Sequence, residues 1–329
     1  MATDTLYRSH TFAFFDAHHW VDWVELCCIA NPDGETDVAS IADRLREERD
    51  IRKTIESREN SDDEGLPSNA QWATESDKHT LLVQEWFQSL AKRAKLLADS
   101  YPFEINSSNA KLQLRAGLTD THRLYVALLM MSNLHYFGKA EADLTSSFET
   151  LGVTVFGWLL PTHAKVHRFG KGPGNNGPYK GHIWDKLKSL ATDLSCTTKC
   201  TKDEFASTDT GEAGLDLVGW VPWEDTAPGR LLLFGQCACS PKWAAKQNEA
   251  SAATWNSKLE LVTNPLTVVL IPFFLRTTSG EWHRRTDFAG HLIIDRLRLL
   301  RTLAASAADH LQLPAFKHVA ACLADKESA

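Results

Sequence analysis

The chain lacks the features that would tie it to a membrane or to export. Its longest apolar run, Leu266–Leu275, has the length of a strand and contains Pro272, whereas a membrane helix needs roughly 18 apolar residues. The opening residues, MATDTLYRSH, are polar and have no apolar segment of the kind found in signal peptides. We therefore expect a cytoplasmic protein that has no membrane partner.

An excess of basic charge is also missing. The 329 residues hold 35 Lys and Arg against 42 Asp and Glu, a formal net charge of −7. This argues against binding of nucleic acid over the whole surface, although a local basic face stays compatible with it.

The cysteines give no clear sign of disulfides or of a zinc site. Seven cysteines, an odd number, without an export signal indicate reduced thiols. Cys196 and Cys200 are spaced C-x3-C, and Cys237 and Cys239 are spaced C-x-C, whereas zinc knuckles commonly use C-x2-C. Small buried thiols are the favoured interpretation, and a zinc site is the alternative.

A phosphate-binding loop is absent from the one stretch that is rich in glycine. The sequence HAKVHRFGKGPGNNGPYKGH, from His163 to His182, does not have the GxxxxGK[ST] spacing. We interpret it as a flexible basic loop. It either lines a nucleic-acid backbone or is a plain surface loop, and the residues that would contact nucleic acid are Lys165, His167, Arg168, Lys171 and Lys180.

The first part of the chain, residues 1–160, reads as a mostly helical domain, and residues 161–329 as a second domain. His18, His19, Asp22 and Glu25 could be taken for a metal cluster, but a helix with a solvated polar face is the simpler interpretation. Most of the 11 tryptophans are expected in the core.

The most informative stretch holds two strand-like runs, Leu215–Val221 and Leu231–Cys237, joined by a polar turn. An acidic residue, Asp216, lies among apolar neighbours in the first run, where it is costly to bury unless it is paired or binds a metal. Gln236 comes near the end of the second run. Two neighbouring strands can place these oxygens at one edge of a sheet, where they suit a hard cation such as Mg²⁺.

From residue 183 the predicted order is helix, strand, strand, helix, strand. This order, with Gly214-Leu215-Asp216 on one strand and Gln236-Cys237-Ala238 on the next, resembles the core of the PD-(D/E)xK nuclease superfamily in its glutamine variant. The resemblance covers about residues 180–275. It implies an α/β protein with a restriction-endonuclease-like mixed-sheet core flanked by helices, preceded by the mostly helical N-terminal domain.

The resemblance also implies a set of site residues. Asp216 and Gln236 would bind Mg²⁺ or Mn²⁺, joined by an acidic residue of the preceding helix, Asp185 first and Asp193 second. The family places a lysine two positions after the glutamine, where this chain has Ala238. Lys246, or else Lys242, on the following helix is expected to take over that role.

The function implied is metal-dependent hydrolysis of phosphodiester bonds in DNA by an effector of a prokaryotic anti-phage defence system. The alternative is a catalytically inactive, nuclease-like subunit that binds nucleic acid or a partner. A partner ATPase or helicase is expected in either case, and a homo-oligomer stays open.

Overall fold

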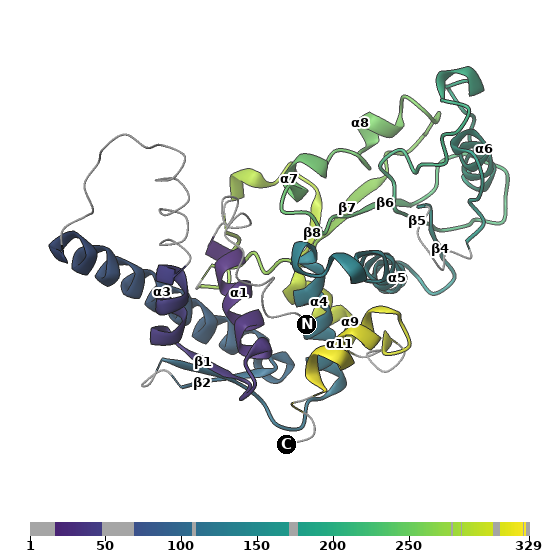
Figure 1. Ribbon diagram of the computed structural model, residues 1–329. Helices are drawn as coiled ribbons and strands as arrows, with labels where there is room; N and C mark the ends of the chain where they lie inside the picture. The colour runs from purple at the N-terminus through teal and green to yellow at the C-terminus, as the bar shows by residue number, and fades with distance from the viewer. Residues whose placement is uncertain are drawn as a thin grey trace. The chain divides into compact units, whose positions relative to one another are not determined.

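The computed structural model describes residues 17–47, 69–106, 110–170, 177–277, 279–283, 285–304, 310–324 and 326. The protein is mixed α/β, with helices, one three-stranded sheet and one five-stranded sheet (Figure 1). Within these residues, the structure contains no helix whose length and apolar character would let it cross a membrane.

The chain divides into two compact units. The first contains Met1–Leu129, Arg276–Glu281 and Lys317–Ala329, and the second contains Met130–Leu275 and Trp282–Phe316. The division predicted from the sequence put the boundary at residue 160, so the segment between residues 130 and 160 groups with the C-terminal part of the chain instead.

The first unit combines helices with a small antiparallel sheet whose strand order is β1-β3-β2. The segments Phe103–Ile105 and Lys111–Ala116 predict a short hairpin from the sequence, and this is confirmed, since β2 and β3 pair from Phe103↔Leu114 to Asn106↔Lys111. Residues 38–47 are also helical. The other elements are α1 (Ala17–Ala30), β1 (Glu35–Asp37), α3 (Asn69–Leu97), β2 (Phe103–Asn106), β3 (Lys111–Leu114), α4 (Asp120–Met131) and α11 (Ala315–Leu323).

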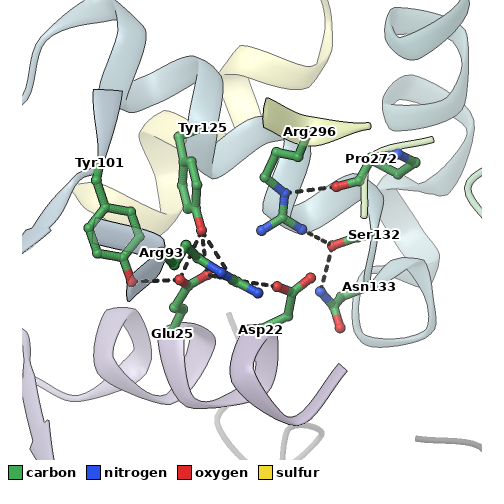
Figure 2. A network of polar contacts seen from close by, with 9 residues as sticks. All are labelled: Asp22, Glu25, Arg93, Tyr101, Tyr125, Ser132, Asn133, Pro272 and Arg296. Carbon is green, nitrogen blue, oxygen red and sulfur yellow. Dashed lines mark hydrogen bonds and ion pairs between the residues drawn. The ribbon is translucent and has the colours of Figure 1, made fainter. Parts of the chain in front are cut away.

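A buried polar network joins α1, α3 and α4 in this unit (Figure 2). Arg93 on α3 lies 2.7 Å from Oδ1 of Asp22 and 2.9 Å from Oε2 of Glu25, both on α1. The hydroxyls of Tyr101 and Tyr125 donate to Glu25 at 2.7 and 2.8 Å. Asp22 and Glu25 therefore bind an arginine inside the unit, and neither belongs to a polar face turned to solvent.

The second unit is built on a five-stranded mixed sheet in the order β4-β5-β6-β7-β8. β5 is antiparallel to both of its neighbours, whereas β6, β7 and β8 are parallel. The strands are β4 (Lys165–Arg168), β5 (Leu217–Trp220), β6 (Leu232–Cys237), β7 (Leu266–Leu270) and β8 (Leu292–Ile294). The helices are α5 (Glu141–Leu159), α6 (Ile183–Asp193), α7 (Trp243–Lys246), α8 (Ala252–Trp255) and α9 (Arg296–Leu303).

Helix α5 packs closely against one face of this sheet. A Cβ on Gly235 of β6 would lie 2.6 Å from the Phe156 ring, and a Cβ on Gly152 of α5 would lie 2.5 Å from Leu217. Real Cβ contacts are longer than this, so glycine at both positions lets the helix and sheet approach. The contact fixes α5 relative to β5 and β6.

The opposite face of the sheet is covered by α6, α7 and α8, so α5 and α8 lie on different sides (Figure 1). Phe234 of β6 and Trp255 of α8 are fully buried there, with ring centroids 5.4 Å apart. At the far end of the sheet, Arg296 begins α9 and donates to the Pro272 carbonyl and to Oγ of Ser132, both at 2.7 Å (Figure 2).

The sequence predicted several of these elements and missed one. The strands within Leu215–Val221 and Leu231–Cys237 and the helix from Ile183 are confirmed. The predicted loop from residue 163 to 182 contains strand β4, so the prediction of a loop throughout was wrong. The helix expected from Trp243 to about Leu259 is two short helices, and that expected at Leu292–Leu311 is β8 followed by α9.

Candidate functional site

Asp216 immediately precedes β5, and Gln236 is the next-to-last residue of the neighbouring strand β6. The pairing of β5 with β6 ends at Leu217↔Gly235, so Asp216 lies just beyond the paired residues, beside the end of β6. The Asp216 amide donates to the Gly235 carbonyl at 2.9 Å, and its own carbonyl accepts the Phe169 amide at 2.8 Å. Asp216 is thus held on both sides at the point where β5 begins and β6 ends.

The Asp216 side chain is buried, with 6% of its surface exposed. Its Oδ2 accepts a hydrogen bond from the Cys237 amide at 2.6 Å. Burial raises the pKa of Asp216 to about 8; the Cys237 hydrogen bond and the charge of Lys246 lower it, and the charges of Glu149 and Glu212 raise it further. A bound cation would favour the ionised form, which burial disfavours.

A second carboxylate, Glu149 on α5, lies beside Asp216. Its Oε2 accepts from Nε and Nη2 of Arg168 at 2.9 and 2.5 Å. Burial raises the pKa of Glu149, Arg168 lowers it, and Glu212 raises it. Glu149 is not among the site residues expected from the sequence. The one available signal was an acidic residue between the apolar residues Phe148 and Leu151, in the helix predicted over Ala140–Leu160.

Gly170 lies beside both carboxylates. A Cβ built on this residue would lie 3.4 Å from Oε2 of Glu149 and 3.8 Å from Oδ1 of Asp216. The residue is buried, and its amide is directed to the Asp216 carbonyl at 3.4 Å. A side chain here would fill the space that the carboxylate oxygens border.

Gln236 contributes a buried oxygen. Only 5% of its surface is exposed, and its Oε1 has no hydrogen-bond partner within the described residues. Buried polar atoms in native proteins are usually paired, so an unpaired one indicates a ligand, an ion or a water. Gln236 is the next-to-last residue of β6, and the amide of the residue after it, Cys237, donates to Asp216.

The lysines and the other predicted acids lie at the surface or bind other partners. Lys246 is exposed on α7, and its charge acts on Asp216. Lys242 is exposed at the start of the same helix, and Ala238 is 1% exposed.

Asp185 is exposed on α6, where it pairs with Lys188 at 3.0 Å. Asp193 accepts a hydrogen bond from the Tyr179 hydroxyl at 2.7 Å.

The basic residues of the predicted loop do not share one environment. Lys165 and Lys180 are exposed. The His167 ring contacts the rings of Tyr179 and Trp220 at centroid distances of 6.1 and 5.5 Å. Arg168 is buried beside Glu149, and Lys171 lies outside the described residues.

The described ranges contain no group of three or more His, Cys, Asp or Glu side chains arranged to hold a metal ion. Two such side chains, Asp216 and Glu149, lie near Gly170, and the Gln236 amide offers a further oxygen at the end of β6. This all-oxygen donor set fits Mg²⁺, which keeps several waters and uses one or two carboxylates. The cysteines do not add to it: Cys237 and Cys239 have raised pKa values because they are buried, and burial raises that of Cys196 to about 11.

Comparison of the chain with protein families, with curated proteins and with solved structures found no match. The site therefore has to be interpreted from its own geometry.

Proposed function

We propose that this chain is a nuclease that hydrolyses phosphodiester bonds in DNA with Mg²⁺ or Mn²⁺. The observation that carries the proposal is the buried acid Asp216 beside the end of β6, where the buried Oε1 of Gln236 has no hydrogen-bond partner within the described residues. Leaving such an oxygen unpaired costs about 1–3 kcal/mol, and leaving a buried carboxylate without a counterion costs more. A cation bound at this point would compensate both.

The sheet supports the more specific proposal of a restriction-endonuclease-like core. An acid at the start of one strand and an amide near the end of its antiparallel neighbour are what the resemblance to the PD-(D/E)xK superfamily implies. A helix before the strands contributes Glu149, which we assign to the acidic position first expected at Asp185. Glu149 borders the same space as Asp216, whereas Asp185 is exposed and paired with Lys188.

In the proposed mechanism, Asp216 and Glu149 would hold the cation, and Gln236 is the third ligand that the resemblance implies. When bound, the cation supplies a water of lowered pKa and positive charge against the scissile phosphate. Lys246, whose charge already acts on Asp216, stabilises the negative charge that develops on the phosphate. Lys165 and Lys180, both exposed, and His167 are assigned to the DNA backbone.

The first test is nicking of supercoiled plasmid by the purified full-length chain in Mn²⁺ or Mg²⁺. Asp216→Asn removes the charge at nearly constant shape and is expected to abolish nicking. Lys246→Ala is expected to lower the rate by roughly 10²–10³-fold if it stabilises the transition state. Asp185→Asn is the matched control and should nick at the wild-type rate.

The assay also decides the assignment of the acids. Full activity in the Asp216→Asn protein rules out the proposed site. Loss of activity in Asp185→Asn together with normal activity in Glu149→Gln would return the acidic position to Asp185.

A second function, a nuclease-like subunit that binds without cutting, is favoured by one observation. Ala238 is buried where the resemblance places a lysine, and its substitute, Lys246, is exposed. Such a subunit would bind Mn²⁺ and shift DNA in a gel without cutting it. A role in anti-phage defence and a partner ATPase or helicase rest on the resemblance alone, and co-purification with the tagged chain from its own host tests for the partner.

A further inference from the structure

Four large apolar side chains are exposed at the end of the five-stranded sheet where β6 and β7 begin. They are Trp223, in the connection between β5 and β6, and Leu231, Val262 and Leu266, with 60%, 53%, 66% and 49% of their surface exposed. In the described part of the second unit, Trp158 is the one other large apolar side chain exposed in this way. Exposed apolar side chains that gather in one place indicate a binding surface, whereas scattered ones do not.

The backbone brings these side chains together into one apolar patch. Leu266 pairs with Leu233, two residues after Leu231 on the neighbouring strand, so Leu231 and Leu266 lie on the same face of the sheet. Val262 lies against the turn before β6, since its Cγ1 would be 3.7 Å from a Cβ on Gly229. The apolar patch therefore follows the starts of two adjacent strands.

A buried arginine with an unused donor lies within this patch. Arg230 immediately precedes Leu231 and is 7% exposed. Its Nη2 donates to Oγ of Ser195 at 2.6 Å and to the Asp225 carbonyl at 3.1 Å. Its Nε is buried and has no hydrogen-bond partner within the described residues.

No acid of the described ranges forms an ion pair with Arg230. The nearest acid in the sequence, Asp225, uses its carboxylate to accept the Ala227 amide at 3.2 Å. Burying a charge is costly unless it is paired. A carboxylate brought to Arg230 by a partner would accept from Nε and supply the missing negative charge.

The charges around the patch favour a protein over a nucleic acid. Glu224 and Asp225 are exposed in the same connection as Trp223, and Glu260 is exposed two residues before Val262. These acids would repel a phosphate backbone. A single carboxylate directed at Arg230, with apolar side chains around it to cover the patch, avoids that repulsion.

We propose that the apolar patch docks a protein segment that presents one acidic side chain among apolar ones, and that Arg230 pairs with its carboxylate. This inference goes beyond the proposed function and does not depend on it. The six residues of β6 separate the patch from the end of the strand beside Asp216, a distance of about 20 Å at roughly 3.3 Å per residue. A partner bound here leaves the candidate cation site open.

The test begins with a displayed library of random peptides selected on the immobilised full-length chain. We expect the enriched peptides to carry Asp or Glu next to apolar residues. One of them is then titrated with the purified chain, as is a second peptide in which the acid is replaced by its amide. Arg230→Gln should bind the acidic peptide at least tenfold more weakly than wild type does, and the amide peptide equally well. A merely structural role of Arg230 would weaken both peptides alike.

Two exposed tryptophans form a matched pair for the apolar contact. Trp223→Ser should weaken the binding of both peptides several-fold, whereas Trp158→Ser, at a tryptophan of the same unit that is 68% exposed, should bind them as wild type does. Arg230→Lys keeps the charge without the planar fork. It should retain part of the preference for the acidic peptide, and it decides the matter if Arg230→Gln does not fold.

The outcomes that overturn the proposal are distinct. They are equal losses for both peptides in Arg230→Gln, normal binding in Trp223→Ser, and a selection that yields no acidic, apolar peptide. A DNA oligonucleotide whose binding in metal-free buffer is lost in Trp223→Ser would make the patch a nucleic-acid surface instead. A dimer in sedimentation that Val262→Ser abolishes would assign it to a second copy of the chain. Peptide binding should persist in Asp216→Asn, which separates this result from the nicking assay.

Discussion

At the scale of single residues, burial distinguishes the acids of this protein. Asp185 is exposed, and its hydrogen bond to Lys188 lowers its pKa, as in many surface ion pairs. The pKa of Asp216 is raised to about 8 because the residue is buried. An acid whose environment disfavours its charge, such as Asp216, is a candidate for function. An acid in a surface ion pair, such as Asp185, has little to gain from a bound cation.

Gly170→Ala tests the space between the carboxylates without removing a ligand. The added Cβ would lie 3.4 Å from Oε2 of Glu149, close enough to fill the space but not to clash. We expect Mn²⁺ affinity to fall at least tenfold, about 1.4 kcal/mol. The metal-free protein should keep its stability or gain about 0.4–1 kcal/mol, because alanine restricts the unfolded chain.

The control for this variant is Gly157→Ala on α5, where an added Cβ has no atom within 4 Å. It should show the same small effect on stability and normal Mn²⁺ binding in the same titration. Normal Mn²⁺ affinity in Gly170→Ala would mean that the cation, if one binds, does so elsewhere.

At the scale of elements, the sequence predicted that Asp216 and Gln236 lie at one edge of the sheet. The reason is that two adjacent antiparallel strands place the start of one beside the end of the other. The two apolar runs define β5 and β6, and a short connection favours an antiparallel pair. Glu149 could not be predicted in this way, because a non-local contact between α5 and the sheet brings it to the site. β4 was missed because its sequence, KVHR, lacks the apolar character of its neighbours at this edge of the sheet.

The contacts of α1, α3 and α4 depend on one buried arginine. Arg93→Met removes the guanidinium that pairs with Asp22 and Glu25, both at most 1% exposed. Breaking a buried ion pair from one side typically costs about 3–5 kcal/mol, and we expect a loss of that size in urea unfolding. Arg46→Met, which breaks a half-exposed pair with Asp43, should cost no more than about 1 kcal/mol. Equal losses in the two variants would contradict the role assigned to the network.

At the scale of the whole molecule, the division of the chain follows packing and not sequence order. Helix α5 precedes residue 160 and was assigned from the sequence to the N-terminal domain, but its contacts with β4, β5 and β6 place it in the sheet unit. Helical periodicity predicts that α5 exists, but it does not say which surface the helix covers. The candidate site depends on this packing, since α5 supplies Glu149.

The pH dependence of stability follows from Asp216. In the unfolded chain its carboxyl loses a proton near the ordinary value of 3.8, and in the folded chain near pH 8. Between these values the folded state binds more protons, so the free energy of unfolding falls as pH rises, by up to about 1.4 kcal/mol per pH unit, and levels off above pH 8. Urea unfolding over this range should show the fall in the wild-type chain.

Asp216→Asn removes the proton that causes this fall. Its free energy of unfolding should stay flatter with pH than that of wild type, and it should exceed the wild-type value at pH 8. Asp185→Asn, at the exposed pair with Lys188, should keep the wild-type slope. Mn²⁺ should flatten the wild-type curve as well, because a cation stabilises the ionised carboxylate in the folded state only. A wild-type curve that falls equally with and without Mn²⁺ would show that Asp216 carries the pH dependence without binding the cation.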